Sequence, residues 1–309
     1  MNTKKINITN QYHSKALTIG TFDGVHIGHQ KILSRVIESA HQKGMESAVL
    51  TLFPHPRMVL EENSSIKLLH TIEERIALLK HFGIQNVIVK PFTKTFANLS
   101  PRDYVKDILV DELHTKVIII GYDHHFGKDR SANIHDLKDF GNEFDFEVEE
   151  ITAQDIENVT VSSTKIRNAL FEGEIETANT YLGYHYFITG IVVTGQRLGR
   201  QLGYPTANIK IREDYKLIPK DGVYVVQSKI EEQTVYGMMN IGSNPTIANK
   251  ERTIEVHFFE LDQKLYDCTL KIEFLKRLRD EYKFDSLEDL KNQLKKDEDN
   301  ALAVLKDLV

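Results

Sequence analysis

The strongest constraint on the fold is a change of hydrophobic pattern near the middle of the chain. In the first half, short apolar runs rich in β-branched residues alternate with amphipathic segments of helical length. Runs without a polar face are typical of parallel strands that helices cover on both sides. The expected strands are residues 16–20, 48–52, 87–89, 117–120 and 144–151. The expected helices are residues 29–42, 72–82, 101–113 and 134–140.

From residue 187 onward, the apolar runs are short and are separated by Gly and Pro turns instead of helices. So many short strands predict a closed antiparallel barrel or a sandwich. Leu287, Leu290 and Leu294 then follow a helical spacing, which predicts a helix that closes on the barrel. We expect its charged stretch, residues 295–299, to be a solvated helix face. The change of pattern predicts two domains, 1–183 and 184–309.

The composition excludes several classes of protein. Lys and Arg number 39 against 45 Asp and Glu, and the net charge of −6 argues against a protein that grips nucleic acid by its phosphates. The lone Cys268 permits neither an internal disulfide nor a cysteine-based zinc site. No signal peptide and no apolar run of membrane-spanning length is visible in the sequence. We expect a cytoplasmic protein that binds neither nucleic acid nor membranes, and homo-oligomerisation stays open.

A loop rich in glycine and histidine, Gly20-Thr21-Phe22-Asp23-Gly24-Val25-His26-Ile27-Gly28-His29, follows the first expected strand. Its glycines let the backbone approach a ligand, and the helix that follows offers free N–H groups and the positive end of its dipole. His26 and His29 add two donors, which suits an α-phosphate under in-line attack. The alternative is that both histidines merely cap the helix. The strand before the loop and the helix after it favour the phosphate site.

A second candidate for phosphate binding is the segment Val161-Ser162-Ser163-Thr164-Lys165-Ile166-Arg167, which places hydroxyls and cations within one turn of a helix start. Ser163 or Thr164 could instead be no more than the N-cap of that helix. Together with the histidine loop, the segment resembles the nucleotidylyl-transferase superfamily, in which two such elements embrace a triphosphate from opposite sides.

The second half has its own phosphate-binding candidate, residues 195–208. Gly195, Gly199 and Gly203 recur every four residues and alternate with two arginines, so that backbone N–H groups and guanidinium groups can both reach a phosphate. Thr206 and Asn208 follow two residues apart and face the same side of a strand. Their oxygen atoms suit Mg²⁺, which bridges substrate phosphates. The alternative is an ordinary glycine-rich barrel turn.

Several further motifs occur in a fixed order along the chain. They are Phe53-Pro54-His55-Pro56, residues 121–127, Arg167, residues 219–224, residues 240–246, Glu255-Val256-His257 and residues 278–284. Over roughly residues 16–306, the chain resembles the bacterial bifunctional riboflavin kinase/FAD synthetase family. The resemblance implies an α/β plus β protein. It would have an N-terminal Rossmann-like nucleotidylyl-transferase domain with a parallel sheet and a C-terminal Greek-key riboflavin kinase β-barrel with a closing helix.

The resemblance also implies the two reactions and their partners. Riboflavin and ATP would give FMN and ADP in the second domain, and FMN and ATP would give FAD and pyrophosphate in the first, both with Mg²⁺. The ATP site of the first domain would comprise Gly20, Phe22, Gly28, Asp123, Ser163, Thr164 and Arg167, with His26 and His29 as catalytic residues. The kinase would bind phosphates through Gly195, Arg197, Gly199, Arg200 and Gly203, Mg²⁺ through Thr206 and Asn208, and flavin through Arg279 and Glu281, with Glu255 as general base.

Some positions depart from the family pattern, and some alternatives stay open. The departures are His124-His125, Ala132, Tyr184-His185 and Asp267. A metal site at Asp123-His124-His125 would compete with a nucleotide site, although no further ligand lies at a characteristic spacing. Glu255 could be a structural carboxylate. The first domain could use another acceptor, such as nicotinate mononucleotide or phosphopantetheine, or have little activity. The protein could also be a non-catalytic flavin-binding regulator.

Overall fold

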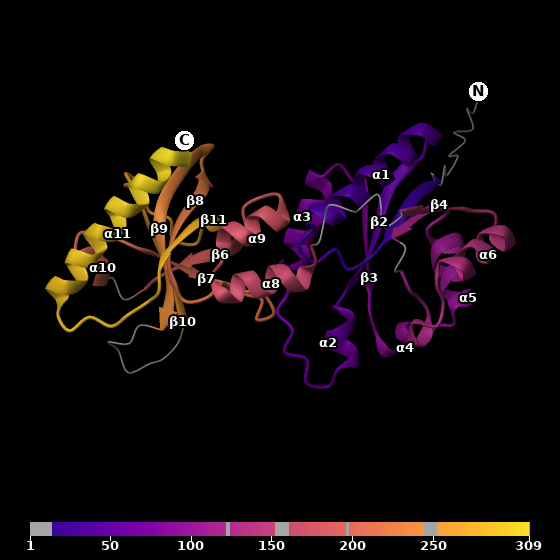
Figure 1. Ribbon diagram of the computed structural model, residues 1–309, viewed down its shortest axis with the longest axis horizontal. Helices are drawn as coiled ribbons and strands as arrows, with labels where there is room; N and C mark the ends of the chain where they lie inside the picture. Colours follow the sequence, from indigo (N-terminus) through magenta and orange to yellow (C-terminus); the bar gives the residue numbers. More distant parts are fainter. Residues whose placement is uncertain (1–13, 122–123, 152–160, 196–197, 244–251, 309) are drawn as a thin grey trace, which may run out of the picture. The chain divides into compact units, whose positions relative to one another are not determined.

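The computed structural model describes residues 14–121, 124–151, 161–195, 198–243 and 252–308 (Figure 1). The chain divides into two compact units. The first comprises Met1–Ile66 and Arg75–Thr160, and the second comprises Lys67–Glu74 and Val161–Val309. These units describe packing rather than activity, so the expected division of the catalytic domains after residue 183 stays a prediction.

The first unit is built on a five-stranded parallel sheet in the order β3-β2-β1-β4-β5. Its strands are β1 (Lys15–Ile19), β2 (Glu46–Phe53), β3 (Asn86–Pro91), β4 (Thr115–Gly121) and β5 (Glu147–Ile151). Its helices are α1 (Ile27–Lys43), α2 (Pro56–Leu60), α4 (Lys94–Ala97), α5 (Pro101–Asp103), η1 (Tyr104–Glu112), η2 (Lys128–Arg130) and α6 (Ile134–Phe144). Helix α3 (Ile72–His81) begins in the segment that belongs to the second unit. The parallel α/β sheet expected from the apolar runs is confirmed.

The buried strands of this sheet carry the core of the first unit. Leu17, Leu50 and Ile118 are fully buried and belong to one apolar cluster with residues of η1 and α6. The expected strand 144–151 begins later than predicted, because Phe144 still lies in α6. Its ring stacks on that of Phe140 one helical turn earlier.

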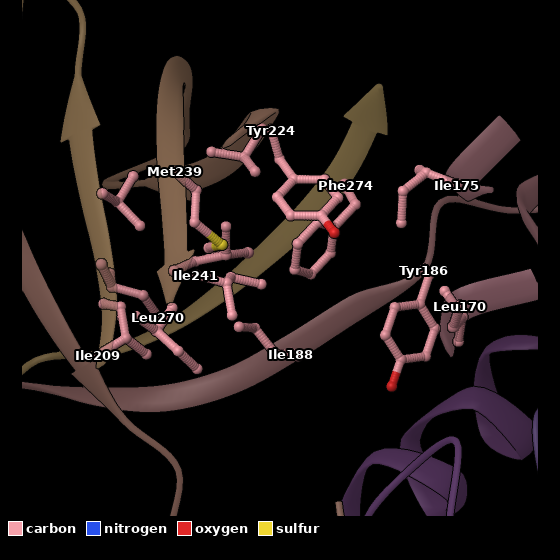
Figure 2. Packing of buried hydrophobic residues seen from close by; sticks show 14 of the residues in the cluster. Leu170, Ile175, Tyr186, Ile188, Ile209, Tyr224, Met239, Ile241, Leu270 and Phe274 are labelled. Atoms are coloured by element: carbon pink, nitrogen blue, oxygen red, sulfur yellow. The ribbon is translucent and has the colours of Figure 1, made fainter. Parts of the chain in front are cut away.

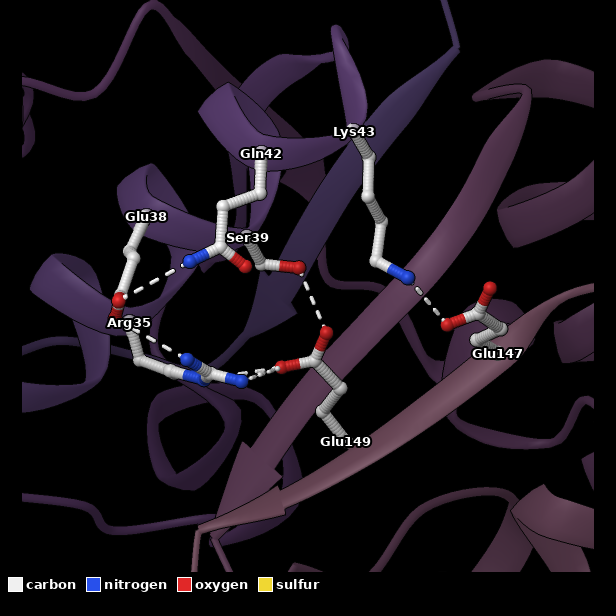
Figure 3. A network of polar contacts seen from close by, with 7 residues as sticks. All are labelled: Arg35, Glu38, Ser39, Gln42, Lys43, Glu147 and Glu149. Carbon is white, nitrogen blue, oxygen red and sulfur yellow. Dashed lines mark hydrogen bonds and ion pairs between the residues drawn. The ribbon is translucent and has the colours of Figure 1, made fainter.

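Charged side chains hold α1 against the edge strand β5 (Figure 3). Glu149 of β5 accepts hydrogen bonds from Arg35 at 3.0 Å and from the Ser39 hydroxyl at 2.7 Å. Lys43 pairs with Glu147 at 2.6 Å. Charges along an edge strand discourage pairing with another chain, so β5 is a protected edge.

The second unit is a closed antiparallel barrel in the order β10-β7-β6-β11-β8-β9. The strands are β6 (Phe187–Val193), β7 (Ala207–Lys210), β8 (Gly222–Ile230), β9 (Gln233–Ser243), β10 (Arg252–Phe258) and β11 (Thr269–Arg279). The helices of this unit are α8 (Ser163–Glu172), α9 (Ile175–Leu182), α10 (Leu198–Gln201) and α11 (Leu287–Leu308). The barrel and its closing helix are confirmed, and the alternative of a sandwich is excluded.

The interior of the barrel is continuous with the packing of α8 and α9. Ile188, Met239 and Phe274 meet inside the barrel, and Leu170 and Ile175 from the two helices belong to the same buried cluster (Figure 2). The other labelled members of that cluster are Tyr186, Ile209, Tyr224, Ile241 and Leu270. The two helices therefore belong to the second unit by packing.

Residues 67–74 join the barrel unit through a buried ion pair. Lys216 is 2% exposed, and its Nζ donates to Glu74 Oε2 at 2.7 Å, to the Leu69 carbonyl at 2.6 Å and to the Phe187 carbonyl at 2.8 Å. The Tyr186 hydroxyl donates to the same Leu69 carbonyl at 2.9 Å. Each hydrogen of the ammonium thus has an acceptor, as a buried charge requires.

Candidate active sites

The histidine loop lies where the order of the strands reverses. The chain leaves the central strand β1 toward β2 and β3, while β4 and β5 lie on its other side. Open parallel sheets bind ligands at such a switch point, beyond the C-terminal ends of their strands. The loop of Gly20 to His26 follows β1, and the segment from His124 to Gly127 follows β4. Both loops therefore belong to the expected ligand site.

The two histidines are held as neutral groups. His26 is the N-cap of α1, and its Nδ1 accepts a hydrogen bond from the backbone N–H of His29 at 3.3 Å. An accepting Nδ1 carries no proton, so the neutral ring has its proton on Nε2. Burial lowers the pKa of His26 to about 4. Burial, and then the charges of His26 and Arg75, lower the pKa of His29 well below its ordinary value.

The environment of His29 indicates a ligand. Its ring stacks on that of His26 with centroids 3.7 Å apart. Its Nδ1 is buried, and within the described part of the chain this atom has no hydrogen-bond partner. Leaving a buried polar atom unsatisfied costs about 1–3 kcal/mol. A polar group bound in the adjacent cavity would satisfy it.

That cavity has a volume of about 830 Å³. Gly20, Phe22 and His29 line it from the β1 side, and His124 and His125 line it from the β4 side. Three cations, Arg57, Lys94 and Arg130, also border it. Its size and charge suit a phosphorylated ligand of nucleotide class.

The loop keeps its shape at some cost in backbone strain. Phe22 and Val25 have φ values of 47° and 36°, a region that few residues other than glycine adopt. A Cβ atom on Gly20 would lie 3.0 Å from the Phe22 ring, so glycine makes room for that ring. Strain of this kind persists where the surroundings fix the conformation.

A buried arginine that the sequence analysis missed supplies part of this support. Arg75 is fully buried, and its guanidinium donates to the Thr21 carbonyl at 2.6 Å and to the Thr51 hydroxyl at 3.2 Å. It therefore fixes the first turn of the histidine loop. One arginine in an amphipathic helix gives no signal in the sequence.

The remaining residues predicted for this site fall into three groups. His26 and Gly28 lie at the start of α1 and do not line the cavity. Asp123 lies outside the described residues. Ser163, Thr164 and Arg167 lie in the first turns of α8, in the second unit. The N-cap there is Ser162, whose side chain accepts from the Lys165 N–H at 3.3 Å, so capping explains neither Ser163 nor Thr164.

The kinase candidates meet on the outer face of the barrel. Glu255 of β10 pairs in register with Asn208 of β7 and with Asn240 of β9, so the three side chains point to the same face. Its neighbours Ile254 and Val256 belong to the buried core. The Thr206 hydroxyl donates to Glu255 Oε2 at 3.1 Å. The predicted general base, Glu255, is therefore a neighbour of the predicted metal ligands Thr206 and Asn208.

A cavity of about 330 Å³ lies on this face, and Thr206, Glu255, Arg279 and Glu281 all line it. Residues of α11 form another part of its wall, including Leu290. A smaller cavity of about 130 Å³ is bordered by Arg200 and Lys264, and Thr206 contributes to both cavities. Thr206 thus stands between a larger, partly apolar space and a smaller space with two cations.

Steric or backbone constraints require glycine at three positions of this region. A Cβ atom on Gly195 would come within 2.1 Å of the Asn208 amide, and one on Gly199 within 2.3 Å of the Tyr204 carbonyl. Gly203 has a left-handed φ of 88°. Arg197 lies outside the described residues.

Arg279 and Glu281 are held by partners that the sequence analysis did not assign to them. Arg279 donates to both carboxylate oxygens of Asp297, at 2.9 and 2.6 Å. Asn240 donates to Glu281 at 3.3 Å. Asp297 is 1% exposed, so the expectation that residues 295–299 form a solvated face is wrong at this position. The charge of Arg279 is what makes a buried carboxylate tolerable there.

Comparison with known proteins accounts for both halves of the chain. A family model described as FAD synthetase matches residues 8–165, and one described as riboflavin kinase matches residues 182–305. A bifunctional riboflavin kinase/FMN adenylyltransferase of Listeria monocytogenes is 38% identical over 94% of this chain and 92% of its own. The chain belongs to the bifunctional riboflavin kinase/FMN adenylyltransferase family. The family member of Bacillus subtilis is 35% identical over 99% of each chain.

A solved structure of similar fold carries a different description. The structure described as a macrolide-efflux protein from Streptococcus pneumoniae matches with a TM-score of 0.82 and 34% identity, over 93% of each chain. The two family models that match this chain, by contrast, both describe flavin enzymes. Among its described residues, no helix is long and apolar enough to cross a membrane. The resemblance expected from the ordered motifs is confirmed.

Proposed function

We propose that the cavity on the outer face of the barrel is where riboflavin is phosphorylated and that the cavity beside the histidine loop is where FMN is adenylylated. The hydrogen bond between Thr206 and Glu255 carries the kinase assignment, because it places a carboxylate beside the oxygen of a proposed metal ligand at the wall of a cavity. In the first unit, His29 supports the adenylyltransferase assignment, because its buried Nδ1 has no hydrogen-bond partner among the described residues.

In the kinase, Glu255 accepts the proton of the ribityl 5′-hydroxyl. That oxygen forms a bond to the γ-phosphorus of ATP, and the bond from phosphorus to ADP breaks. Thr206 and Asn208 would hold Mg²⁺, which draws charge from the phosphate oxygens. The described residues contain no group of three or more His, Cys, Asp or Glu side chains that could hold a metal by themselves. A site of few protein oxygens suits Mg²⁺, which keeps waters and substrate phosphates as ligands.

In the adenylyltransferase, an FMN phosphate oxygen attacks the α-phosphorus of ATP and pyrophosphate leaves. His29 stabilises the charge on the α-phosphate as a neutral donor, and the family resemblance gives His26 the same role; burial keeps both rings uncharged. The N-terminus of α1 adds its N–H groups and its dipole. The family resemblance gives Ser163, Thr164 and Arg167 of α8 the role of phosphate ligands, and gives Asp123 a place beside the nucleotide.

We place the boundary between the two catalytic domains between Gly183 and Tyr184. The larger barrel cavity is lined by residues 199–297, and the cavity beside the histidine loop by residues 18–130. Each cavity is thus formed from one side of that boundary. The packing boundary differs, since α8 and α9 complete the core of the barrel unit.

A product assay with variants of the whole chain tests these assignments. Riboflavin, ATP and Mg²⁺ are supplied, and FMN and FAD are separated by chromatography. Glu255→Gln should lower FMN formation by about 10²- to 10⁴-fold and leave FAD formation from supplied FMN unchanged. His29→Ala should lower FAD formation by about 10²- to 10³-fold and leave FMN formation unchanged.

Glu172→Gln and His41→Ala are matched controls, because both side chains are exposed on helices and neither lines a cavity. Equal loss of both products in either test variant would contradict the assignment of that residue. For the metal ligands, Asn208→Ala should recover part of its kinase activity as Mg²⁺ is raised, whereas Glu255→Gln should not.

A further inference from the structure

We propose that Asp297 and Glu298, consecutive residues of α11, are positioning residues of the kinase. Asp297 aligns Arg279 on the flavin side of the barrel cavity. Glu298 holds Tyr204, and through it the approach to Thr206, on the phosphate side. The inference rests on the proposed use of this cavity as the kinase site.

Asp297 fixes the guanidinium of Arg279 in one orientation. Arg279 donates through Nε and through its second terminal nitrogen to the two carboxylate oxygens. Such a two-point pair sets the plane of the guanidinium as well as its distance. Gln293 donates to the same carboxylate at 2.8 Å, and the Tyr282 ring lies 4.5 Å from the guanidinium carbon. Arg279 therefore meets a ligand in a preset plane.

Glu298 acts through Tyr204, which also lines the cavity. Glu298 Oε2 accepts a hydrogen bond from the Tyr204 hydroxyl at 3.1 Å. Tyr204 is separated from Thr206 by Pro205 alone, so it fixes the backbone that leads into the proposed metal ligand.

His257 secures the same stretch from the barrel side. Its Nδ1 lies 2.8 Å from the Pro205 carbonyl, which can only accept, so the ring donates there. Its ring also packs edge-on against that of Tyr204, with centroids 5.2 Å apart. Tyr204 and Pro205 are thus held between α11 and strand β10.

The helix that carries the two acids is itself anchored. Ala301 and Leu305 of α11 are buried against Val225 and Leu275 of the barrel. Consecutive helical residues point about 100° apart, so one turn reaches toward two different walls. A single rigid turn of α11 therefore sets the distance between the flavin side and the phosphate side.

Steady-state kinetics of riboflavin phosphorylation by the whole chain separate the two contacts. Asp297→Asn keeps the size of the side chain and removes its charge. It should raise the KM for riboflavin by about tenfold and change the KM for ATP by less than about twofold, since a lost charge-assisted hydrogen bond acts on Arg279. Tyr204→Phe should do the reverse and raise the KM for ATP by about three- to tenfold. Lys296→Ala, at the exposed position directly before Asp297, is the control and should change neither constant.

Two further variants distinguish positioning from a merely structural role. In an Arg279→Ala background, Asp297→Asn should cause no further rise in the KM for riboflavin, because its effect passes through Arg279. Glu298→Gln keeps an oxygen acceptor for Tyr204 and should retain most of the activity that Glu298→Ala loses. If Asp297→Asn proves insoluble, the variants Tyr204→Phe, Glu298→Gln and Glu298→Ala still test the positioning role of Glu298.

Three results would contradict these proposals. Unchanged Michaelis constants, or equal rises in both constants for every variant, would overturn the positioning roles. Full FMN formation by Glu255→Gln would instead refute the use of this cavity as the kinase site, whatever the constants show. Loss of activity in Glu255→Gln together with unshifted constants in Asp297→Asn and Tyr204→Phe would refute positioning alone.

Discussion

Removal of the Glu74 carboxylate should destabilise the barrel unit by an amount that the contacts of Lys216 define. In Glu74→Ala, the Lys216 ammonium keeps its hydrogen bonds to the Leu69 and Phe187 carbonyls but loses the charged acceptor Glu74. Breaking a buried ion pair from one side typically costs about 3–5 kcal/mol. Glu74 also accepts from the Thr71 N–H at 3.0 Å, and loss of such a cap costs about 1 kcal/mol. We expect a total loss of about 4–6 kcal/mol.

Differential scanning calorimetry of the whole chain measures this loss. For a unit of this size, each kcal/mol lowers Tm by about 2–4 °C, so the transition of the barrel unit should move down by at least about 8 °C. Glu74→Met combined with Lys216→Met should recover most of the stability, since apolar replacement of a buried pair is often neutral. Glu176→Ala, which breaks an exposed pair with Lys276, should cost less than about 1 kcal/mol.

Two outcomes would refute the reasoning. One is a loss below about 1 kcal/mol in Glu74→Ala, which would mean that the Leu69 and Phe187 carbonyls alone satisfy the ammonium. The other is a double variant whose loss equals the sum of the two single losses, because two residues that form one pair must couple.

Three further predictions follow from packing and charge. Because burial lowers the folded-state pKa of His26 to about 4, the stability that its neutral ring contributes is present above pH 6.5 and is lost as the pH falls toward 4. Unfolding of the first unit at pH 5 should therefore need about 2 kcal/mol less than at pH 7 on account of this ring, and His26→Asn should weaken that dependence. A fragment of residues 184–309 should unfold at a lower temperature than one of residues 161–309, because it lacks the buried side chains of α8 and α9. Gly242→Ala should raise the KM for riboflavin and spare FAD formation, since the new Cβ would lie 2.1 Å from the Glu281 carboxylate; equal kinetics in the variant would remove Glu281 from the flavin site.

The sequence predicts those parts of the structure that depend on local pattern. Apolar β-branched runs predict the parallel strands, and the glycine and histidine loop is recognisable because its chemistry lies in consecutive residues. The roles of Arg75 and Lys216 depend on contacts between distant segments, so no local pattern reveals them. The buried role of Asp297, by contrast, could have been predicted from the sequence. It occupies the apolar stripe of α11 formed by Leu290, Leu294, Ala301 and Leu305, where an acid needs a partner.

The segment Lys67–Glu74 also sets an order of events during synthesis. The chain passes between the two units after Ile66, after Glu74 and after Thr160, so no single cut leaves both units complete. Glu74 and its partner Lys216 are 142 residues apart. At about 5–20 residues per second, a ribosome makes Glu74 about 7 to 28 seconds before Lys216. For that interval Glu74 has no Lys216 to pair with, so the segment Lys67–Glu74 cannot take its place in the barrel unit until residues made much later are available.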